Sequence, residues 1–227
     1  MTDFSSEQVQ GVYQAIFSRR DMRHFNNTPI PEDTLQRCLQ AAHHAPSVGY
    51  MQPWRIIRVN DAEKRKALHE LAETERLKTC EAIAESDEGK KDEFAKLKVQ
   101  GILDCAEILV VSLMPEREKH VFGRRTIPEM DLASASCAIQ NFWLAARVEN
   151  IGVGWVSFFE KQDVRALFNM PEDAEPIAIL CVGYVDKFYD KPMLEEEGWA
   201  QRGELSDYVM TDNWDFEKED RNQKQWS

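Results

Sequence analysis

Residues 131–157 read DLASASCAIQNFWLAARVENIGVGWVS, and this stretch predicts a helix that is followed at once by a strand. Apolar side chains recur in it at spacings of three and four residues, as on one face of an amphipathic helix: Leu132, Ala135, Ile139, Phe142 and Ala146. We expect Asp131 to cap a helix over 132–149. Gly152 and Gly154 are expected in a turn that runs into the strand.

The rest of the chain supplies further helices and three more strands. We expect strands over 54–59, 108–114 and 176–184, which are short and rich in branched apolar residues. Helices are expected over 6–20, from Pro31 onward, over 161–168, and as a pair across 61–100 that joins around 86–89. Helices therefore outnumber strands and are expected to enclose them.

The charge balance narrows the classes of partner. The 227 residues carry 28 Lys and Arg against 40 Asp and Glu, a formal net charge of -12. Such a surface repels nucleic acid and anionic membranes, so neither is expected as a partner. An anionic ligand would need a local basic pocket. No apolar segment approaches the length of a membrane helix or a signal peptide, so we expect a cytoplasmic protein.

Cysteine and histidine spacings give no metal motif. The five cysteines are widely separated, without a C-x-x-C pair, and we expect each to be buried and reduced: Cys38, Cys80, Cys105, Cys137 and Cys181. The five histidines show no H-E-x-x-H or H-x-H spacing. No metal site is predicted.

Three arginines stand together where the first helix ends, at Arg19, Arg20 and Arg23. A guanidinium can bind a phosphate through two parallel hydrogen bonds, so this cluster is a candidate anion site. The alternative is a solvated helix end whose cations complement the helix dipole.

Two loops could approach a flat ligand. Residues 45–54, A-P-S-V-G-Y-M-Q-P-W, combine glycine with the hydroxyl of Ser47 and the amide of Gln52, although an ordinary connection could have the same composition. In residues 152–157, G-V-G-W-V-S, two glycines could turn backbone N–H groups toward a ligand. A dinucleotide loop is disfavoured, because this pattern lacks a third glycine and follows a helix.

The order of these motifs over residues 8–209 resembles the nitroreductase family of flavoproteins. The resemblance implies an α+β fold in which a central, mostly antiparallel sheet is wrapped by helices, and an intertwined homodimer with FMN at the subunit interface. We expect one domain over 1–227, with a helical lid at about 61–100. A C-terminal arm at about 187–227 carries scattered aromatic residues, and we expect it to wrap over another surface, including a partner subunit.

The resemblance also implies which residues contact the cofactor. Phosphate contacts are expected from the arginine segment, flavin contacts from the 45–54 loop, and ring contacts from the segment that ends at Ser157. A C-terminal basic residue of the family has its match at Arg202. The expected cofactor-binding residues are Arg19, Arg20, Met22, Arg23, Pro46, Ser47, Gln52, Gly154, Trp155 and Arg202.

Two departures from the usual nitroreductase pattern indicate a particular branch. Asp21 stands where a serine is usual and Tyr50 where an asparagine is usual. A carboxylate weakens an anion site but suits proton transfer. The pattern resembles the branch that fragments reduced FMN with O2 into 5,6-dimethylbenzimidazole, the lower ligand of cobalamin, and erythrose 4-phosphate. The resemblance implies Asp21 as general acid/base, Ser157 as a hydroxyl that orients or relays a proton, and reduced FMN as a substrate. We expect a separate flavin reductase to supply reduced FMN, because the sequence has no nicotinamide-binding motif and the lid would leave little room for a second cofactor.

Other readings of the same residues stay open. Asp21 could be a salt-bridge partner of Arg20 or Arg23, and Ser157 a strand hydroxyl without chemistry. An alternative function on this fold is an NAD(P)H-dependent FMN nitroreductase or dehalogenase, which would retain FMN through turnover. A second alternative is a flavin-binding or storage protein without catalysis.

Overall fold

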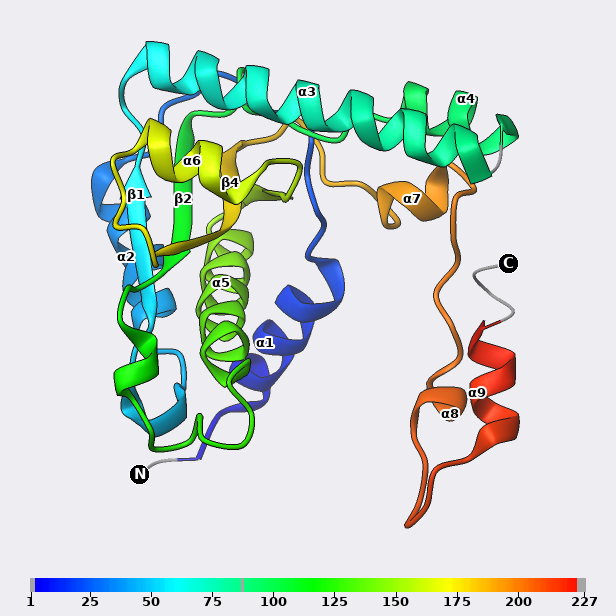
Figure 1. Cartoon of the computed structure of the whole chain (residues 1–227). Coiled ribbons are helices and arrows are strands. Elements are labelled where there is room, and N and C mark those ends of the chain that lie inside the picture. The colour runs from blue at the N-terminus through cyan, green and yellow to red at the C-terminus, as the bar shows by residue number, and fades with distance from the viewer. Residues whose placement is uncertain (1–2, 87, 224–227) are drawn as a thin grey trace. The chain divides into compact units, whose positions relative to one another are not determined.

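The computed structural model describes residues 3–86 and 88–223, and the chain divides into two compact units at the boundary between Phe188 and Tyr189. The first unit contains the sheet and the helices around it (Figure 1). The second unit spans nearly the same residues as the expected arm. The assignment of one domain with a lid and an arm stays a prediction, and residues 1–2, 87 and 224–227 of it lie outside the described part of the chain.

The sheet of the first unit has four strands in the order β1-β2-β4-β3, and each neighbouring pair is antiparallel. Three predicted strands are present within one residue of their expected bounds, as β1 (Trp54–Arg58), β2 (Glu107–Leu113) and β4 (Glu175–Tyr184), and the strand expected after the long helix is β3 (Ile151–Val156). The expectation of an α+β fold around a mostly antiparallel sheet is therefore confirmed.

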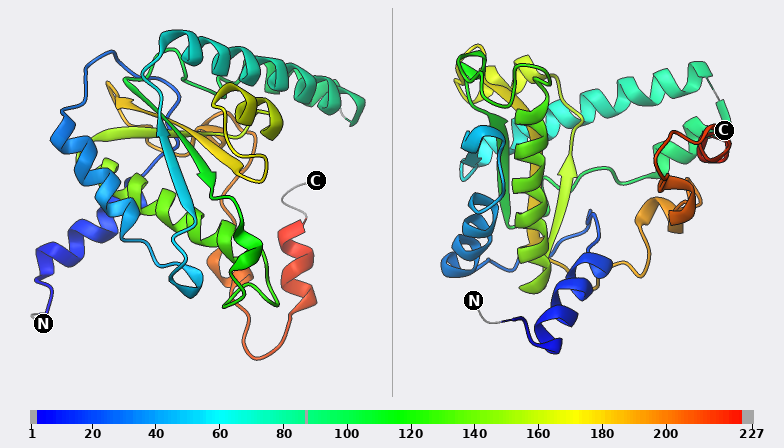
Figure 2. Two further views of the ribbon diagram at one scale, coloured as in Figure 1. Left: turned by 60° about the vertical axis from the view of Figure 1, so that its left-hand side comes forward. Right: turned by 90° about the horizontal axis from the view of Figure 1, so that it is seen from below.

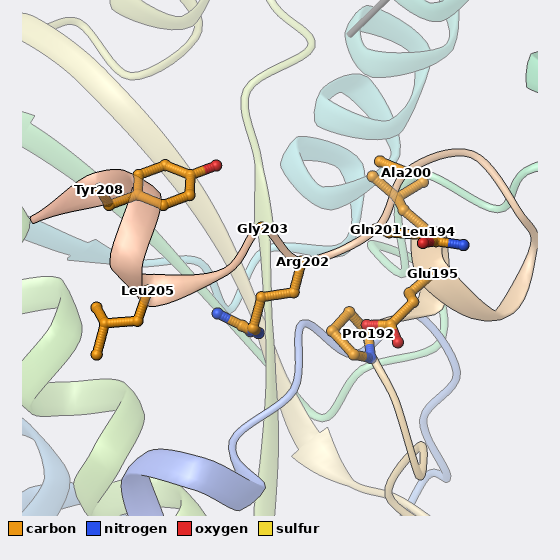
Figure 3. A pocket seen from close by; sticks show the side chains of 9 residues that line it. All are labelled: Pro192, Leu194, Glu195, Ala200, Gln201, Arg202, Gly203, Leu205 and Tyr208. Atoms are coloured by element: carbon orange, nitrogen blue, oxygen red, sulfur yellow. The ribbon is translucent and has the colours of Figure 1, made fainter. Parts of the chain in front are cut away.

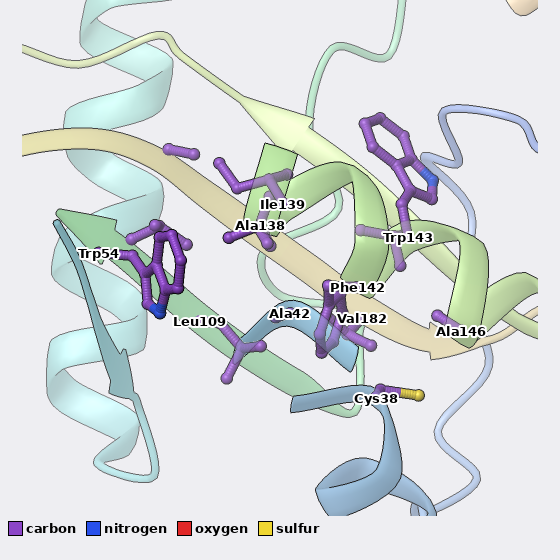
Figure 4. Packing of buried hydrophobic residues seen from close by; sticks show 14 of the residues in the cluster. Cys38, Ala42, Trp54, Leu109, Ala138, Ile139, Phe142, Trp143, Ala146 and Val182 are labelled. Atoms are coloured by element: carbon purple, nitrogen blue, oxygen red, sulfur yellow. The ribbon is translucent and has the colours of Figure 1, made fainter. Parts of the chain in front are cut away.

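One face of the sheet packs on α2 (Glu32–His43) and α5 (Met130–Val148). Leu109 and Val111 of β2 belong to this core, together with Ile139 and Phe142 of α5 (Figure 4). These helix residues lie on the apolar stripe that the sequence predicts, and burial of that stripe holds α5 on the sheet.

Helices α3 (Ala62–Ser86) and α6 (Lys161–Leu167) cover the opposite face (Figure 2). A second core lies beneath them. Ile108 and Val110 of β2 point to this side, because successive strand residues alternate between faces. The central strands are thus covered on both sides, which explains their nearly continuous apolar sequence.

The long charged region 61–100 forms α3 and then α4 (Glu88–Lys96), so the predicted pair of helices is confirmed. Leu68 and Ala72 anchor α3 in the second core, and Phe94 of α4 is also buried. Arg65 donates to the carbonyls of Cys105 and Ala106 at 2.6 and 3.0 Å. The first turns of α3 are thereby fixed to the segment that enters β2.

Helix α1 (Ser6–Ser18) begins at a capping box in which Ser5 and Gln8 satisfy each other's backbone N–H groups. Ala15 is its one buried residue, whereas Val12 and Phe17 keep 56% and 71% of their surface exposed. The apolar stripe of α1 therefore contributes little to the core of its own unit.

Over residues 189–223, the second unit has three short helices joined by irregular segments: α7 (Met193–Glu196), α8 (Leu205–Tyr208) and α9 (Phe216–Gln223). Arg221 of α9 pairs with Asp207 of α8 at 2.9 Å, and Asn222 donates to the Asp207 carbonyl at 3.1 Å. These contacts join α8 and α9 into a helical hairpin.

Two local predictions are wrong. Asp131 does not cap α5: the cap residue is Glu129, and Asp131 lies inside the first turn, drawn into a buried pair with Arg117. Gly152 and Gly154 lie within β3 and not in a turn, which instead contains Asn150 in the left-handed region (φ 57).

The prediction for the cysteines holds for four of the five. Cys137 is exposed on α5, and Cys38, Cys80, Cys105 and Cys181 are buried and reduced. Across residues 3–86 and 88–223, no group of three or more potential metal ligands occurs, and no helix has the length and apolarity needed to cross a membrane.

Candidate active site

The segment after α1 lies along the outer side of β3 and forms the centre of the candidate site. Asp21 makes a parallel bridge with Val153, and the Met22 N–H donates to the Val153 carbonyl at 3.0 Å. The Trp155 N–H donates to Asp21 Oδ1 at 2.9 Å. A side-chain carboxylate thus takes the acceptor position that a backbone carbonyl would fill in a regular strand pair.

The glycines of β3 make room for this segment. A Cβ at position 154 would lie 2.2 Å from the Met22 carbonyl oxygen and 2.7 Å from Arg23 Nη1. At position 152 it would lie 2.6 Å from Val185 Cγ1 and 3.0 Å from Met22 Cγ. The two glycines therefore leave room for Met22 and Arg23 to pack against the strand. The sequence instead suggests that these glycines let a ligand approach the backbone.

Asp21 is held by its neighbours and can still be reached. Its carboxylate forms an ion pair with Arg23, whose Nη2 also donates to the Trp155 carbonyl at 3.0 Å. The Asp21 side chain keeps 42% of its surface exposed. Burial among the packed residues raises the pKa of Asp21, and this effect exceeds the lowering by Arg23, by the Trp155 N–H and by Arg19.

Trp143 of α5 supports the two preceding arginines. Its indole N–H donates to the Arg20 carbonyl at 3.1 Å, and the Arg19 guanidinium lies over its ring at 4.8 Å. The Arg20 guanidinium donates to the carbonyls of Phe17 and Arg19, each at 2.8 Å. A cation–π contact and backbone hydrogen bonds therefore fix the start of the arginine segment.

A fourth arginine, which the sequence analysis missed, joins the cluster from α5. Arg147 donates to the Ser18 carbonyl at 3.3 Å, where α1 ends. Burial, followed by repulsion from Arg20, lowers the pKa of Arg147. Like charges gathered in this way favour an anion between them. The one signal for Arg147 in the sequence is its position in the last turn of the helix that precedes β3.

The 46–52 loop lies between α2 and β1 and includes the single turn η1 (Val48–Tyr50). Gly49, Tyr50 and Gln52 all have positive φ, between 50 and 53°. The Ser47 hydroxyl accepts a hydrogen bond from the Gln52 N–H at 3.1 Å, which closes the loop. Pro46 is exposed, and within the described residues the Gln52 side-chain amide makes no hydrogen bond.

The remaining predicted residues are exposed. Ser157 follows the last residue of β3, two positions beyond Trp155. Arg202 belongs to the second unit, where it lines a hollow of about 500 Å³ with Leu205 and Tyr208 among others (Figure 3).

The structure therefore brings some of the predicted residues into direct contact. Asp21, Arg23 and Trp155 form one hydrogen-bonded group, and Arg19 and Arg20 meet at Trp143. The 46–52 loop has its own contacts, which run to α5 and to the segment after β2.

The arrangement of an arginine segment on a glycine-bearing strand agrees with a comparison to known families. The profile of the Nitroreductase family matches residues 16–184. The chain belongs to the nitroreductase family. The matched range includes Asp21, the arginines beside it, the 46–52 loop and β3.

Two curated relatives of this chain share one enzyme name. The chain is similar to a 5,6-dimethylbenzimidazole synthase of Rhodospirillum rubrum, with 37% identity over 187 residues, which cover 81% of this chain and 86% of that protein. It is also similar to a 5,6-dimethylbenzimidazole synthase of Rhodobacter capsulatus, with 35% identity, which covers 88% of this chain and 95% of that protein.

A solved structure of the nitroreductase fold gives the same architecture. A BluB-like flavoprotein from Clostridium difficile superimposes with a TM-score of 0.66 at 16% identity, covering 89% of this chain and 99% of that one. At this identity the likeness concerns the fold alone, which agrees with the antiparallel sheet and its two helical layers.

Proposed function

We propose that this chain is a 5,6-dimethylbenzimidazole synthase, which uses O2 to fragment reduced FMN into 5,6-dimethylbenzimidazole and erythrose 4-phosphate for the lower ligand of cobalamin. The observation that carries the proposal is the Asp21 carboxylate, held on β3 by the Trp155 N–H and Arg23 and still partly exposed. The names of the two curated relatives support the same reaction.

The donor chemistry of the site fits FMN. Arg19, Arg20, Arg23 and Arg147 gather cations at one end of α1, as a phosphate requires. The Gln52 amide can donate to and accept from a flavin ring, because it uses neither capacity within the described residues. We propose phosphate contacts from the arginine segment with Met22, and flavin contacts from Pro46, Ser47, Gln52, Gly154 and Trp155, with Arg202 as a further phosphate ligand.

Reduced FMN, when bound, supplies the electron-rich ring that reacts with O2. The residues of the chain must move protons at ribityl carbons and ring nitrogens. Asp21 is suited to this work because a carboxyl can accept and release a proton, because burial raises its pKa above the ordinary value, and because its side chain stays partly exposed. The exposed hydroxyl of Ser157 would orient or relay a proton at the end of β3.

The exposed apolar stripe of α1 supports a homodimer. Val12 and Tyr13 keep more than half of their surface exposed, and Phe17 keeps 71%. A stripe of this kind on a helix predicts a partner surface, and a second copy of the chain would cover it. We further propose that a separate flavin reductase supplies reduced FMN and that the enzyme works in the cytoplasm without a metal.

The decisive experiment is aerobic incubation of the purified protein with chemically reduced FMN, followed by chromatography of the products. We expect 5,6-dimethylbenzimidazole and erythrose 4-phosphate in equal amounts. A matched incubation contains oxidised FMN, NADPH and a nitroaromatic compound. Rapid nitro reduction without loss of flavin would overturn the proposal in favour of an NAD(P)H-dependent nitroreductase, and unchanged flavin in both incubations would indicate a binding protein.

A further inference from the structure

Three charged side chains with little exposed surface hold the loop between β2 and α5, residues 114–129. Asp131 Oδ2 accepts from Arg117 Nε at 2.9 Å and pairs with Arg124 Nη2 at 3.1 Å. The Asp131 side chain is 6% exposed, and those of Arg117 and Arg124 are 10% and 11% exposed. We call Arg117, Arg124 and Asp131 the arginine clamp.

The arginine clamp also binds the backbone of this loop at both ends. Arg117 Nη1 donates to the Met114 carbonyl at 2.6 Å, and its Nη2 reaches Glu175 at 2.9 Å on β4. Arg124 donates to the Arg117 carbonyl at 2.7 Å and to the Pro128 carbonyl at 3.3 Å. The loop is thus tied to β4 and to the first turn of α5, and its conformation depends on these ion pairs.

The tip of the loop packs directly on η1. A Cβ at Gly123 would lie 2.2 Å from Val48 Cγ2, and a Cβ at Gly49 would lie 2.7 Å from the Phe122 carbonyl oxygen. The Val48 N–H donates to the Ser134 hydroxyl of α5 at 3.0 Å. Glycine is needed on both sides of this contact, because a Cβ at Gly49 would meet the Phe122 backbone and a Cβ at Gly123 would meet the branched side chain of Val48.

The position of Gln52 depends on the contact between residues 122–123 and η1. Its N–H is bound by the Ser47 hydroxyl, on the residue directly before η1. The positive φ of Gln52 is a strained conformation for a residue other than glycine, so it persists only when its surroundings hold it. A displacement of Val48 would therefore shift both ends of the Ser47–Gln52 hydrogen bond.

We propose that the arginine clamp is a positioning device for flavin binding: it fixes residues 121–123, which hold η1, and η1 presents Ser47 and Gln52. The inference rests on the proposed function, since that places Ser47 and Gln52 at the flavin. Arg117, Arg124 and Asp131 act through the loop and need no contact with the ligand.

The test uses Arg124→Gln in the full-length protein. Arg117 still pairs with Asp131 in this variant, so the first turn of α5 keeps its buried partner. We expect the dissociation constant of oxidised FMN, from fluorescence titration, and the KM for reduced FMN each to rise about tenfold, with kcat within about twofold of the parent. A fall in kcat at unchanged affinity would overturn the proposal.

Arg58→Gln is the matched control. Arg58 forms a bidentate pair with Glu107 at 2.7 and 2.8 Å, at the end of β1 farther in sequence from η1. The Arg58→Gln substitution should lower the thermal midpoint without changing the affinity for FMN. Equal weakening of FMN binding in both variants would show a general effect of stability and would contradict the positioning role.

Val48→Ala tests the same proposal at the contact between η1 and residues 122–123, and it leaves all three residues of the arginine clamp in place. We expect about a threefold rise in the FMN dissociation constant, and no further rise when it is combined with Arg124→Gln. Additive effects, or no effect of Val48→Ala, would overturn the proposal. If Arg124→Gln does not fold, Val48→Ala decides alone.

The affinity measurement separates this proposal from the proposed reaction. If the parent protein binds FMN but releases no 5,6-dimethylbenzimidazole, the reaction is wrong and the comparison of dissociation constants still tests the clamp. If the parent protein does not bind FMN, both proposals are wrong.

Discussion

The Asp21 carboxylate accepts a hydrogen bond from the Trp155 backbone N–H at 2.9 Å, across 134 positions of sequence. The same carboxylate pairs with Arg23, which donates in turn to the Trp155 carbonyl. Asp21 and Arg23 therefore bind the N–H and the carbonyl of one residue on β3. The candidate general acid/base is oriented by the strand itself.

Asp21→Asn should abolish product formation while leaving FMN bound. The amide keeps the shape of the side chain but cannot exchange a proton at neutral pH, and loss of a general acid/base typically slows a reaction about 10² to 10⁴-fold. Product chromatography gives the rate and fluorescence titration the affinity. Comparable product formation by the variant and the parent would remove Asp21 from the catalytic mechanism.

The same substitution should change the dependence of stability on pH. Because the pKa of Asp21 is raised in the folded state, the folded protein holds this proton more tightly than the unfolded chain does. The contribution of Asp21 to the free energy of unfolding therefore falls as pH rises from about 4, the pKa of Asp in the unfolded chain, through its pKa in the folded protein. The thermal midpoint of Asp21→Asn minus that of the parent should be larger at pH 7 than at pH 4, and a smaller difference at pH 7 would contradict the raised pKa.

Gly154→Ala should destabilise the protein by about 3 kcal/mol or more. The new Cβ would meet the Met22 carbonyl, which belongs to backbone and cannot swing aside. Gly11→Ala is the matched control, because a Cβ at this position of α1 meets nothing within 4 Å, and it should stabilise by about 0.5 to 1 kcal/mol. Denaturant unfolding measures both, and similar values for the two variants would refute the packing argument.

Trp143→Phe should cost about 1 to 3 kcal/mol, since the Arg20 carbonyl loses its indole donor. Without this anchor the arginine segment should also bind phosphate less well. We expect the preference for FMN over riboflavin, taken as a ratio of dissociation constants, to fall in the variant. An unchanged ratio would mean that Trp143 supports the fold but not the proposed phosphate site.

Charged substitutions on α1 should separate the proposed homodimer. Val12→Asp combined with Phe17→Asp places two carboxylates on the exposed apolar stripe, where burial against a partner would be costly. Sedimentation velocity should show a dimer for the parent and a monomer for the variant. Gln10→Asp adds a charge on an already polar, exposed residue of the same helix and should remain dimeric.

Local patterns were sufficient to predict most helices and strands. Residues 132–149 show the period of a buried helix face, and the structure has α5 at Met130–Val148. The sequence indicates β2 and β4 clearly because burial on both faces gives nearly continuous apolar runs. Asp131 was misread because a capping residue and a buried ion-pair partner look alike when distant arginines are unknown.

The candidate site was predicted as a set of residues, but the reasons for its geometry could not be. The contact of Asp21 with Trp155 depends on how the sheet folds, and no local spacing encodes it. Trp143 carries no motif of its own, and its importance arises from the two arginines that fold against it. The glycines of β3 were noticed for an expected approach to a ligand, whereas the structure uses them to admit Met22 and Arg23.

The bridge between Asp21 and Val153 also bears on aggregation. β3 is an outermost strand, and an outermost strand with unpaired backbone groups is a template for pairing with other chains. Met22 and Asp21 occupy the Val153 carbonyl and the Trp155 N–H, so the residues proposed for chemistry also shield this edge. Substitutions that detach the segment should therefore make the protein prone to form insoluble intermolecular sheet as well as inactive.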